Sequence, residues 1–175
     1  AWRLAKKMKE QKLIDSHAHL LDERFDEDRA QLIEDLSRQM EAVIECASAP
    51  EDFERILELT RRYPLIYGAV GVHPESVDAY TQQALERIEH LLEEPKILAI
   101  GEIGLDYHWE PEKKERQKEA LCAQMELAGR LRRPVVLHSR DATADMLALL
   151  GEFPGQRGVL HCFSGSVDTA RELLN

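Results

Sequence analysis

The chain has 175 residues, and 43% of them are hydrophobic, which is enough apolar material for the core of one ordinary domain. Its 23 basic and 33 acidic residues give a formal net charge of −10, which argues against binding a polyanion through a broad basic surface. A phosphate-containing substrate is still compatible with this charge, because bound cations can reverse the local field. No stretch approaches the length of a transmembrane helix.

The cysteines and the N-terminal residues add two expectations. Cys46, Cys122 and Cys162 are widely spaced and form no Cys-x-x-Cys pair, so they are interpreted as free thiols in a reducing compartment, the cytoplasm. Residues 1–12 are rich in lysine and arginine and are interpreted as a basic extension. The domain itself is expected to cover 13–175.

From residue 13 onward, short apolar runs alternate with helical stripes six times. The first run, Leu13-Ile14, leads directly into Asp15-Ser16-His17-Ala18-His19. Further strands are expected at 42–46, 65–72, 97–100, 134–138 and 158–163. Helices are expected at 26–41, 50–62, 111–131 and 141–150, with another that ends before Pro95 and a last one capped by Ser166.

This alternation predicts a parallel sheet with crossover helices. A doubly wound sheet of six strands is the alternative, and such a sheet binds its ligands at a switch point between strands. Here polar candidates follow strands one, three, four, five and six, and a ring at the C-terminal strand ends is typical of a TIM barrel. Because a closed (β/α)8 barrel takes about 250 residues, we expect an α/β chain of TIM-barrel type. It should contain about six of the eight β/α units and be incomplete at its C-terminus.

The first strand predicts a metal ligand pair. His17 and His19 are two residues apart, so they share one face of a strand, and imidazole suits zinc-like divalent cations. Glu102 follows the fourth strand, and its two oxygens can bridge two cations. Gly101 and Gly104 are expected to leave room around it.

Two further histidines complete the predicted centre. His138 ends the fifth strand and His161 ends the sixth. Each histidine alone is more often a hydrogen-bonded core residue, and Glu102 alone could pair with an arginine. Four histidines and one glutamate at corresponding strand ends instead predict a two-cation site, which can activate water for hydrolysis.

Other polar residues are candidates for substrate contacts. His73, in Gly71-Val72-His73-Pro74, could contact a substrate phosphate or cap its loop. Arg140 is a candidate phosphate clamp, because guanidinium matches phosphate oxygens bidentately; its alternative is an ion pair with Asp141 or a nearby glutamate. Asp106 is expected to shape the loop after the fourth strand. Trp109 could stack on a base or cover an edge of the core.

Five motifs in this order resemble the successive motifs of the TatD family, a family of metal-dependent deoxyribonucleases in the amidohydrolase superfamily. The motifs are Asp15-Ser16-His17-Ala18-His19, Gly71-Val72-His73-Pro74, Gly101-Glu102-Ile103-Gly104-Leu105-Asp106-Tyr107, His138-Ser139-Arg140-Asp141-Ala142 and His161-Cys162-Phe163-Ser164-Gly165. The resemblance covers 13–175. It implies a TIM barrel, a cytoplasmic location and metal-dependent hydrolysis of phosphodiester bonds, often as a 3′→5′ exonuclease on DNA.

The same resemblance implies a ligand set. His17, His19 and Glu102 would hold one cation, and Glu102, His138 and His161 would hold the other. Magnesium, manganese and zinc are all compatible with such ligands. The resemblance also implies a general-base aspartate after an eighth strand, and no residue of this chain matches it.

Two other functions stay open on the sequence alone. The same scaffold can hydrolyse an amide or an ester, since fold does not determine chemistry. A lysine at the bridging position after the fourth strand would favour amide or ester hydrolysis. This chain has Glu102 there, which favours the nuclease. The chain could also be a catalytically silent metal-binding fragment, because the expected aspartate has no match.

Overall fold

The structure is a computed structural model that describes residues 12–174. Except for Lys12, the predicted basic extension at 1–12 lies outside the described residues, and the domain boundary at residue 13 stays a prediction. Six parallel strands form one sheet in the order β1-β2-β3-β4-β5-β6. They are β1 (Leu13–Ala18), β2 (Met40–Cys46), β3 (Ile66–Val70), β4 (Ile97–Asp106), β5 (Val135–Arg140) and β6 (Gly158–Leu160).

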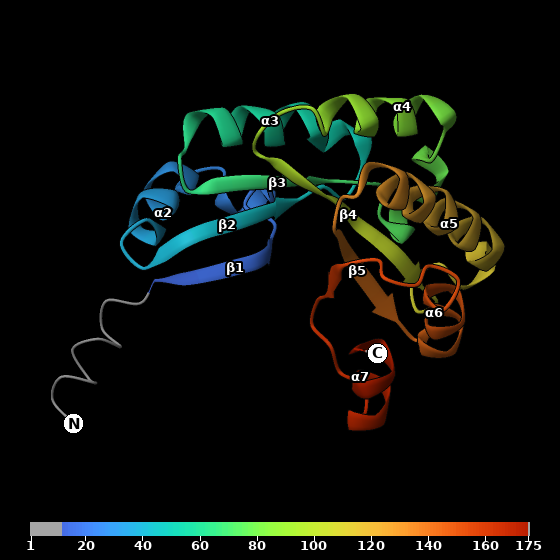
Figure 1. The fold of residues 1–175 in the computed structure, drawn as a ribbon. Coiled ribbons are helices and arrows are strands. Elements are labelled where there is room, and N and C mark those ends of the chain that lie inside the picture. The colour runs from blue at the N-terminus through green and yellow to red at the C-terminus, as the bar shows by residue number, and fades with distance from the viewer. Residues whose placement is uncertain (1–11, 175) are drawn as a thin grey trace, which may run out of the picture.

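Helices connect the strands and follow the outer side of the curved sheet, as α3, α4 and α5 do in Figure 1. The α-helices are α2 (Arg29–Leu36), α3 (Phe53–Arg62), α4 (Gln82–Leu91), α5 (Lys114–Leu131), α6 (Thr143–Leu150) and α7 (Val167–Leu174). Short 3-10 helices are η1 (Glu23–Phe25), η2 (Pro50–Asp52), η3 (Pro74–Ala79) and η4 (Pro111–Lys113). None of the helices within 12–174 is long and apolar enough to cross a membrane.

The strand order decides between the two predicted architectures. Within the described residues each strand pairs in parallel with the next one along the chain, without the reversal that makes a switch point. The strands fan around a common interior in a nearly closed barrel (Figure 1). The prediction of a TIM-type barrel with six β/α units is therefore confirmed.

The two faces of the sheet bury different side chains. Large apolar residues such as Phe53, Ile88 and Met125 pack between the helices and the outer face of the sheet. The inner face carries a separate small cluster of Cys46, Ala69, Ala99 and Val136. Small side chains on the inner face leave space at the strand ends, where the polar residues gather.

Capping explains where two of the helices begin. The Thr81 hydroxyl accepts the Ala84 N–H at 3.1 Å before α4, and the Ser166 hydroxyl accepts the Thr169 N–H at 3.1 Å before α7. The predicted cap at Ser166 is therefore confirmed.

Three predicted boundaries were wrong. The helix expected at 26–41 is only Arg29–Leu36, because the chain turns after Leu36 and Met40 already belongs to β2. The strand expected at 97–100 continues to Asp106, because it keeps pairing with β5 beyond its glycines. The strand expected at 158–163 ends at Leu160.

Candidate metal centre

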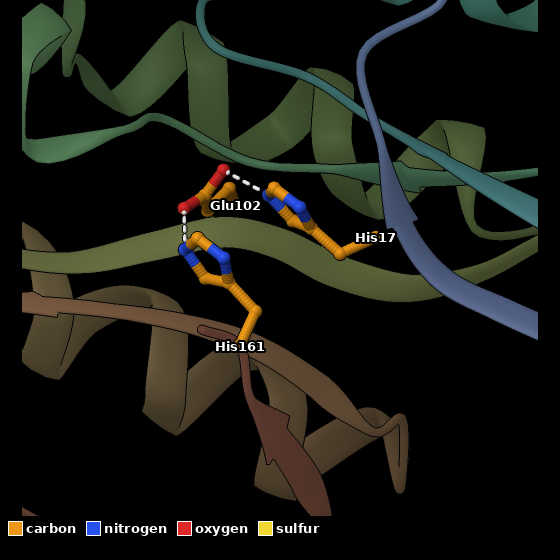
Figure 2. A group of neighbouring side chains, drawn as sticks. All are labelled: His17, Glu102 and His161. Atoms are coloured by element: carbon orange, nitrogen blue, oxygen red, sulfur yellow. Dashed lines mark hydrogen bonds and ion pairs between the residues drawn. The ribbon is translucent and has the colours of Figure 1, made fainter. Parts of the chain in front are cut away.

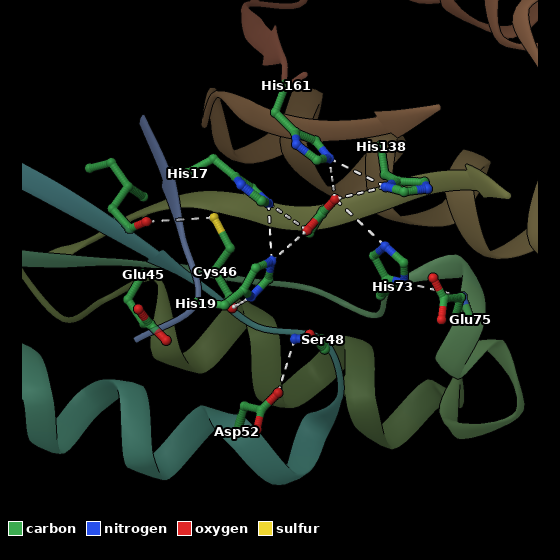
Figure 3. Close-up of polar contacts among 12 residues, drawn as sticks. His17, His19, Glu45, Cys46, Ser48, Asp52, His73, Glu75, His138 and His161 are labelled. Carbon is green, nitrogen blue, oxygen red and sulfur yellow. Dashed lines mark hydrogen bonds and ion pairs between the residues drawn. The ribbon is translucent and has the colours of Figure 1, made fainter. Parts of the chain in front are cut away.

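Five histidines surround one buried carboxylate at the C-terminal ends of the strands; Figure 3 labels the histidines, and Figure 2 shows Glu102 with His17 and His161. The residues are His17, His19, His73, His138 and His161 around Glu102. Oε2 of Glu102 lies 2.7 Å from His17 Nε2 and 3.2 Å from His19 Nε2. Oε1 lies 2.5 Å from His161 Nε2 and 3.0 Å from His138 Nδ1. All five predicted metal ligands therefore meet at one point.

The parallel sheet brings these residues together from distant parts of the chain. His17 lies in β1 and His138 in β5, while His161 directly follows β6. Glu102 lies within β4, between the strands that carry the histidines. Because the C-terminal ends of parallel strands share one edge, side chains up to 144 positions apart become neighbours (His17 and His161 stack with ring centroids 3.8 Å apart).

The two glycines beside Glu102 have a different role from the one predicted. A Cβ on Gly104 would overlap the backbone carbonyl of His138, and one on Gly101 would lie 2.7 Å from Val136 Cβ. Gly104 also has a φ of 152°, which side chains rarely permit. The glycines therefore allow β4 to approach β5 closely, and they set the position of Glu102 relative to His138.

Hydrogen bonds on the far side of two rings orient them toward Glu102. His138 Nε2 lies 2.9 Å from Asp106 Oδ2, so Nε2–H donates to Asp106 and the Nδ1 lone pair faces the centre. His19 Nδ1 lies 3.1 Å from the Cys46 carbonyl and donates to it, which leaves the Nε2 lone pair facing the centre. This pattern of an outward donor and an inward lone pair is typical of metal-binding histidines.

His73 turns its protonated nitrogen, not a lone pair, toward the centre. Its Nδ1 accepts the Glu75 N–H at 3.2 Å, so in the neutral ring the proton is on Nε2. That Nε2 faces Glu102 Oε1 at 3.6 Å (Figure 3). His73 therefore presents a hydrogen-bond donor to the centre, although its position would also suit a ligand. The predicted loop cap is confirmed by the Nδ1 contact with Glu75 N–H, while contact with a substrate phosphate stays a prediction.

The donor set fits divalent cations. Two groups of three residues have donor atoms within 4.8 Å of one another, His17-Glu102-His161 and His73-Glu102-His138. The Nε2 atoms of His17 and His19 also lie only 3.1 Å apart. Ring nitrogens that face one another and one carboxylate so closely are what a shared cation would hold together. Nδ1 of His161 is buried and has no hydrogen-bond partner in the described residues, so the hydrogen-bonding capacity of this nitrogen is unsatisfied.

These groupings differ from the pairs that the resemblance implies: His161 is grouped with His17, His73 takes the second place beside His138, and His19 is in neither group. His161 lies near His17 on one side and 3.3 Å from His138 Nδ1 on the other. The geometry is compatible with either assignment of His161. Glu102 is common to every grouping, as expected for a carboxylate that bridges two ions.

The electrostatics of the centre favour a charged carboxylate. Burial alone would raise the pKa of Glu102, but the imidazoles of His138, His161, His17 and His19 that contact its oxygens lower it well below its usual range. The proximity of the Glu102 carboxylate raises the pKa of His19. Burial would lower the pKa of His138, but the neighbouring carboxylates of Glu102 and Asp106 raise it.

Within residues 12–174, Arg140 forms no ion pair with Asp141 or a nearby glutamate, which was its alternative role. Asp141 instead lies 3.1 Å from His108 Nδ1, and the Arg140 guanidinium lies 5.4 Å from the Trp109 ring centroid. Arg140 is exposed at the end of β5. Trp109 is 59% exposed, so it does not cover an edge of the core.

Two residues of the site were not identified from the sequence. Asp106 was expected only to shape its loop, yet it also orients His138, and its place at the end of an apolar strand was the available signal. Glu45 is fully buried in β2 and holds the backbone next to His19; nothing in its local pattern distinguishes it from a solvent-facing residue.

Known proteins are similar to this chain in sequence and in fold. Residues 14–175 match the family model described as "TatD related DNase". The chain is 37% identical over 165 residues to the "Uncharacterized metal-dependent hydrolase YabD" of Bacillus subtilis, covering 93% of this chain and 65% of that protein. It is 34% identical over 167 residues to the "3'-5' ssDNA/RNA exonuclease TatD" of Cronobacter turicensis, covering 93% of this chain and 63% of the relative.

A solved structure agrees with the sequence matches. The YJJV protein of Escherichia coli K12, titled a TatD homologue, superposes with a TM-score of 0.84 at 33% identity, over 93% of this chain and 64% of that one. The chain thus spans slightly less than two thirds of the length of these relatives. With a family match over nearly all of its length and a shared fold, the chain belongs to the TatD-related DNase family.

Proposed function

We propose that this protein is a metal-dependent hydrolase that cleaves phosphodiester bonds of DNA as a 3′→5′ exonuclease, using two divalent cations. The observation that carries the proposal is the convergence of five histidines on the buried carboxylate of Glu102. Family membership supports hydrolysis of an ester bond, and one relative is named a 3′-5′ ssDNA/RNA exonuclease. We include a cytoplasmic location in the proposal, because all three cysteines are free thiols.

The proposed ligands are His17, His19, Glu102, His138 and His161. Bound divalent cations would supply Lewis acidity and lower the pKa of a bound water. The chain's own part is to hold the donor atoms in place. Asp106 and the Cys46 carbonyl keep the lone pairs of His138 and His19 aimed inward. Glu102 stays charged and lies between the two sides of the centre.

Two residues are proposed to contact the substrate phosphate. The Nε2–H of His73 points into the centre and can donate to a non-bridging phosphate oxygen. Arg140 lies two residues beyond His138 on the same strand, so its guanidinium can reach a phosphate at the edge of the centre. Together they supply donors where the net charge of the chain would otherwise repel DNA.

The test uses the 175-residue chain, purified without metal, and a single-stranded oligonucleotide labelled at its 5′ end. Adding Mg²⁺, Mn²⁺ or Zn²⁺ should produce successive shortening from the 3′ end, and EDTA should stop it. Glu102→Gln and His138→Ala should each lower the rate by about 100-fold or more, the size expected when a catalytic metal site is disrupted.

The matched control is His90→Ala, which removes an exposed histidine on α4 whose ring lies 3.5 Å from Glu93. It should cleave at the wild-type rate. Cleavage that survives both Glu102→Gln and His138→Ala would overturn the site. If the chain binds metal but cleaves no DNA, the nuclease proposal is wrong for this chain, and parallel amide and ester substrates then separate another hydrolase from a silent fragment.

A further inference from the structure

We propose that Trp109 and Arg140 form a stacking subsite for an unpaired nucleobase, next to the phosphate held at the metal centre. The proposal rests on the nuclease function proposed above and adds to it the form of nucleic acid that the site selects. Trp109 lies in the loop after β4 and keeps 59% of its surface exposed, which is unusual for the largest apolar side chain.

The Trp109 ring already has polar and charged neighbours. The Arg140 guanidinium lies 5.4 Å from the ring centroid, within the range of a cation–π contact. The His108 ring meets Trp109 edge-on, at 4.6 Å and 90°. His108 is itself tied to Asp141 at 3.1 Å. The Arg140 guanidinium therefore lies over one face of the indole, while 59% of the Trp109 surface stays exposed and can receive a base.

The loop that carries Trp109 is fixed directly to the metal centre. Oδ1 of Asp106 accepts the backbone N–H of both His108 and Trp109, at 2.9 and 2.8 Å. Oδ2 of the same carboxylate accepts from His138 Nε2 at 2.9 Å. One buried side chain thus joins the exposed indole to a proposed metal ligand.

Arg140 reaches the same place from the neighbouring strand. It is paired in register with Asp106 on β4, and it lies two residues beyond His138 on β5. A guanidinium can contact a phosphate and stack against a ring at the same time. Arg140 therefore lies beside the indole and two residues from a proposed metal ligand, where it would hold the phosphate of a nucleotide whose base rests on Trp109.

The chemistry selects a single-stranded nucleic acid. An indole face binds any base by stacking, but only a base that is out of its duplex stack can reach it. Such short-range stacking can offset the long-range repulsion between DNA and a chain of net charge −10. Local affinity at this subsite would therefore come from the base as well as from the phosphate.

The test is spectroscopic and independent of cleavage. The chain contains two tryptophans, so Trp2→Phe leaves Trp109 as the only source of tryptophan emission. In EDTA, titration with a short oligo-dT strand should quench Trp109 emission to saturation. A hairpin duplex of similar size and a strand of abasic sites should not quench it. No quenching at saturating oligo-dT would overturn the proposal.

Substitution gives a second readout. Trp109→Ala should weaken binding of labelled oligo-dT by roughly 5- to 100-fold, the range for loss of one stacked base, and leave binding of the abasic strand unchanged. Trp109→Phe should restore most of the affinity, because it keeps an aromatic face. Equal affinity of wild type and Trp109→Ala for oligo-dT would overturn the subsite.

Cleavage of the same strand separates this proposal from the nuclease proposal. In the active enzyme, Trp109→Ala should raise KM for the single strand rather than lower kcat, since the indole contacts a base and not the reacting atoms. Metal-dependent cleavage with an unchanged KM in Trp109→Ala would overturn the subsite and leave the nuclease standing. Quenching by oligo-dT without any cleavage would support the subsite and overturn the nuclease.

Discussion

Glu45 is a buried carboxylate that holds the chain in place beside His19. Its two oxygens accept the backbone N–H groups of Leu20 at 2.7 Å and Leu21 at 2.9 Å. The carbonyl of the next residue, Cys46, accepts from His19 Nδ1. Two adjacent residues of β2 therefore determine both the path of the loop and the direction of the imidazole, as the neighbouring positions of Glu45, Cys46 and His19 in Figure 3 show.

Burial also gives Glu45 a measurable effect on stability. Burial raises the pKa of Glu45 to about 7, against the opposing effect of its two backbone hydrogen bonds. In the unfolded chain a glutamate titrates near its usual value of about 4.3. The folded state therefore binds more protons between these values, so Glu45 favours folding most at low pH, and this contribution is lost as the pH rises through 7.

The expected result is a pH-dependent difference between wild type and Glu45→Gln. In metal-free buffer, the free energy of unfolding of wild type should fall relative to Glu45→Gln by up to about 3 kcal/mol between pH 4.5 and pH 8. Urea denaturation at several pH values measures it. Glu41→Gln, an exposed glutamate on the same strand, should keep the wild-type slope. An identical slope in Glu45→Gln and wild type would contradict the assignment.

At the scale of elements, β4 is the strand on which the centre depends. Its apolar run is visible in the sequence, but the glycines after Ile100 resemble the start of a turn. In the structure the same glycines let the strand continue to Asp106 against β5. The close approach at Gly104 faces the backbone of His138, so packing between two strands positions two proposed ligands.

Gly104→Ala should therefore be strongly destabilising. The added Cβ would meet the His138 backbone at a φ that only glycine adopts readily, with an expected loss of about 2–4 kcal/mol in the free energy of unfolding. Gly155→Ala is the matched control, because Gly155 also has a positive φ, of 79°, but nothing within 4 Å of its Cβ position. It should cost only about 1 kcal/mol. Equal losses in urea denaturation would mean that strand approach does not matter.

At the scale of the whole molecule, the curvature of the sheet makes the centre. Residues from β1 and from the end of β6 lie within ring-stacking distance, as Figure 2 shows for His17 and His161. This contact joins the first and last described strands through side chains. A cation shared by these residues would therefore stabilise the folded arrangement of the entire sheet.

Metal binding is accordingly expected to raise the melting temperature. At a free metal concentration about 100 times the Kd, the gain is about 2.7 kcal/mol, or roughly 5–10 °C for a chain of this size. Thermal unfolding with Zn²⁺ or Mn²⁺, and again with EDTA, measures the shift. Glu102→Gln should lose most of the shift and His90→Ala should keep it. A melting temperature that does not respond to any divalent cation would contradict the proposed centre.

The sequence by itself determined the alternation of strands and helices and the residues that carry the site. Both follow from local periodicity and from the rule that parallel strands end at one edge, which is why His17, His19, Glu102, His138 and His161 could be placed together in advance. The family resemblance rested on those same positions.

Only the tertiary structure decided how these residues face one another. The inward nitrogen of His138 depends on Asp106, that of His19 on Cys46, and the donor role of His73 on Glu75. Strand alternation does not specify which ring nitrogen carries a proton. That choice depends on hydrogen bonds made after the sheet has curved, and for His19 and His138 the partners lie on neighbouring strands.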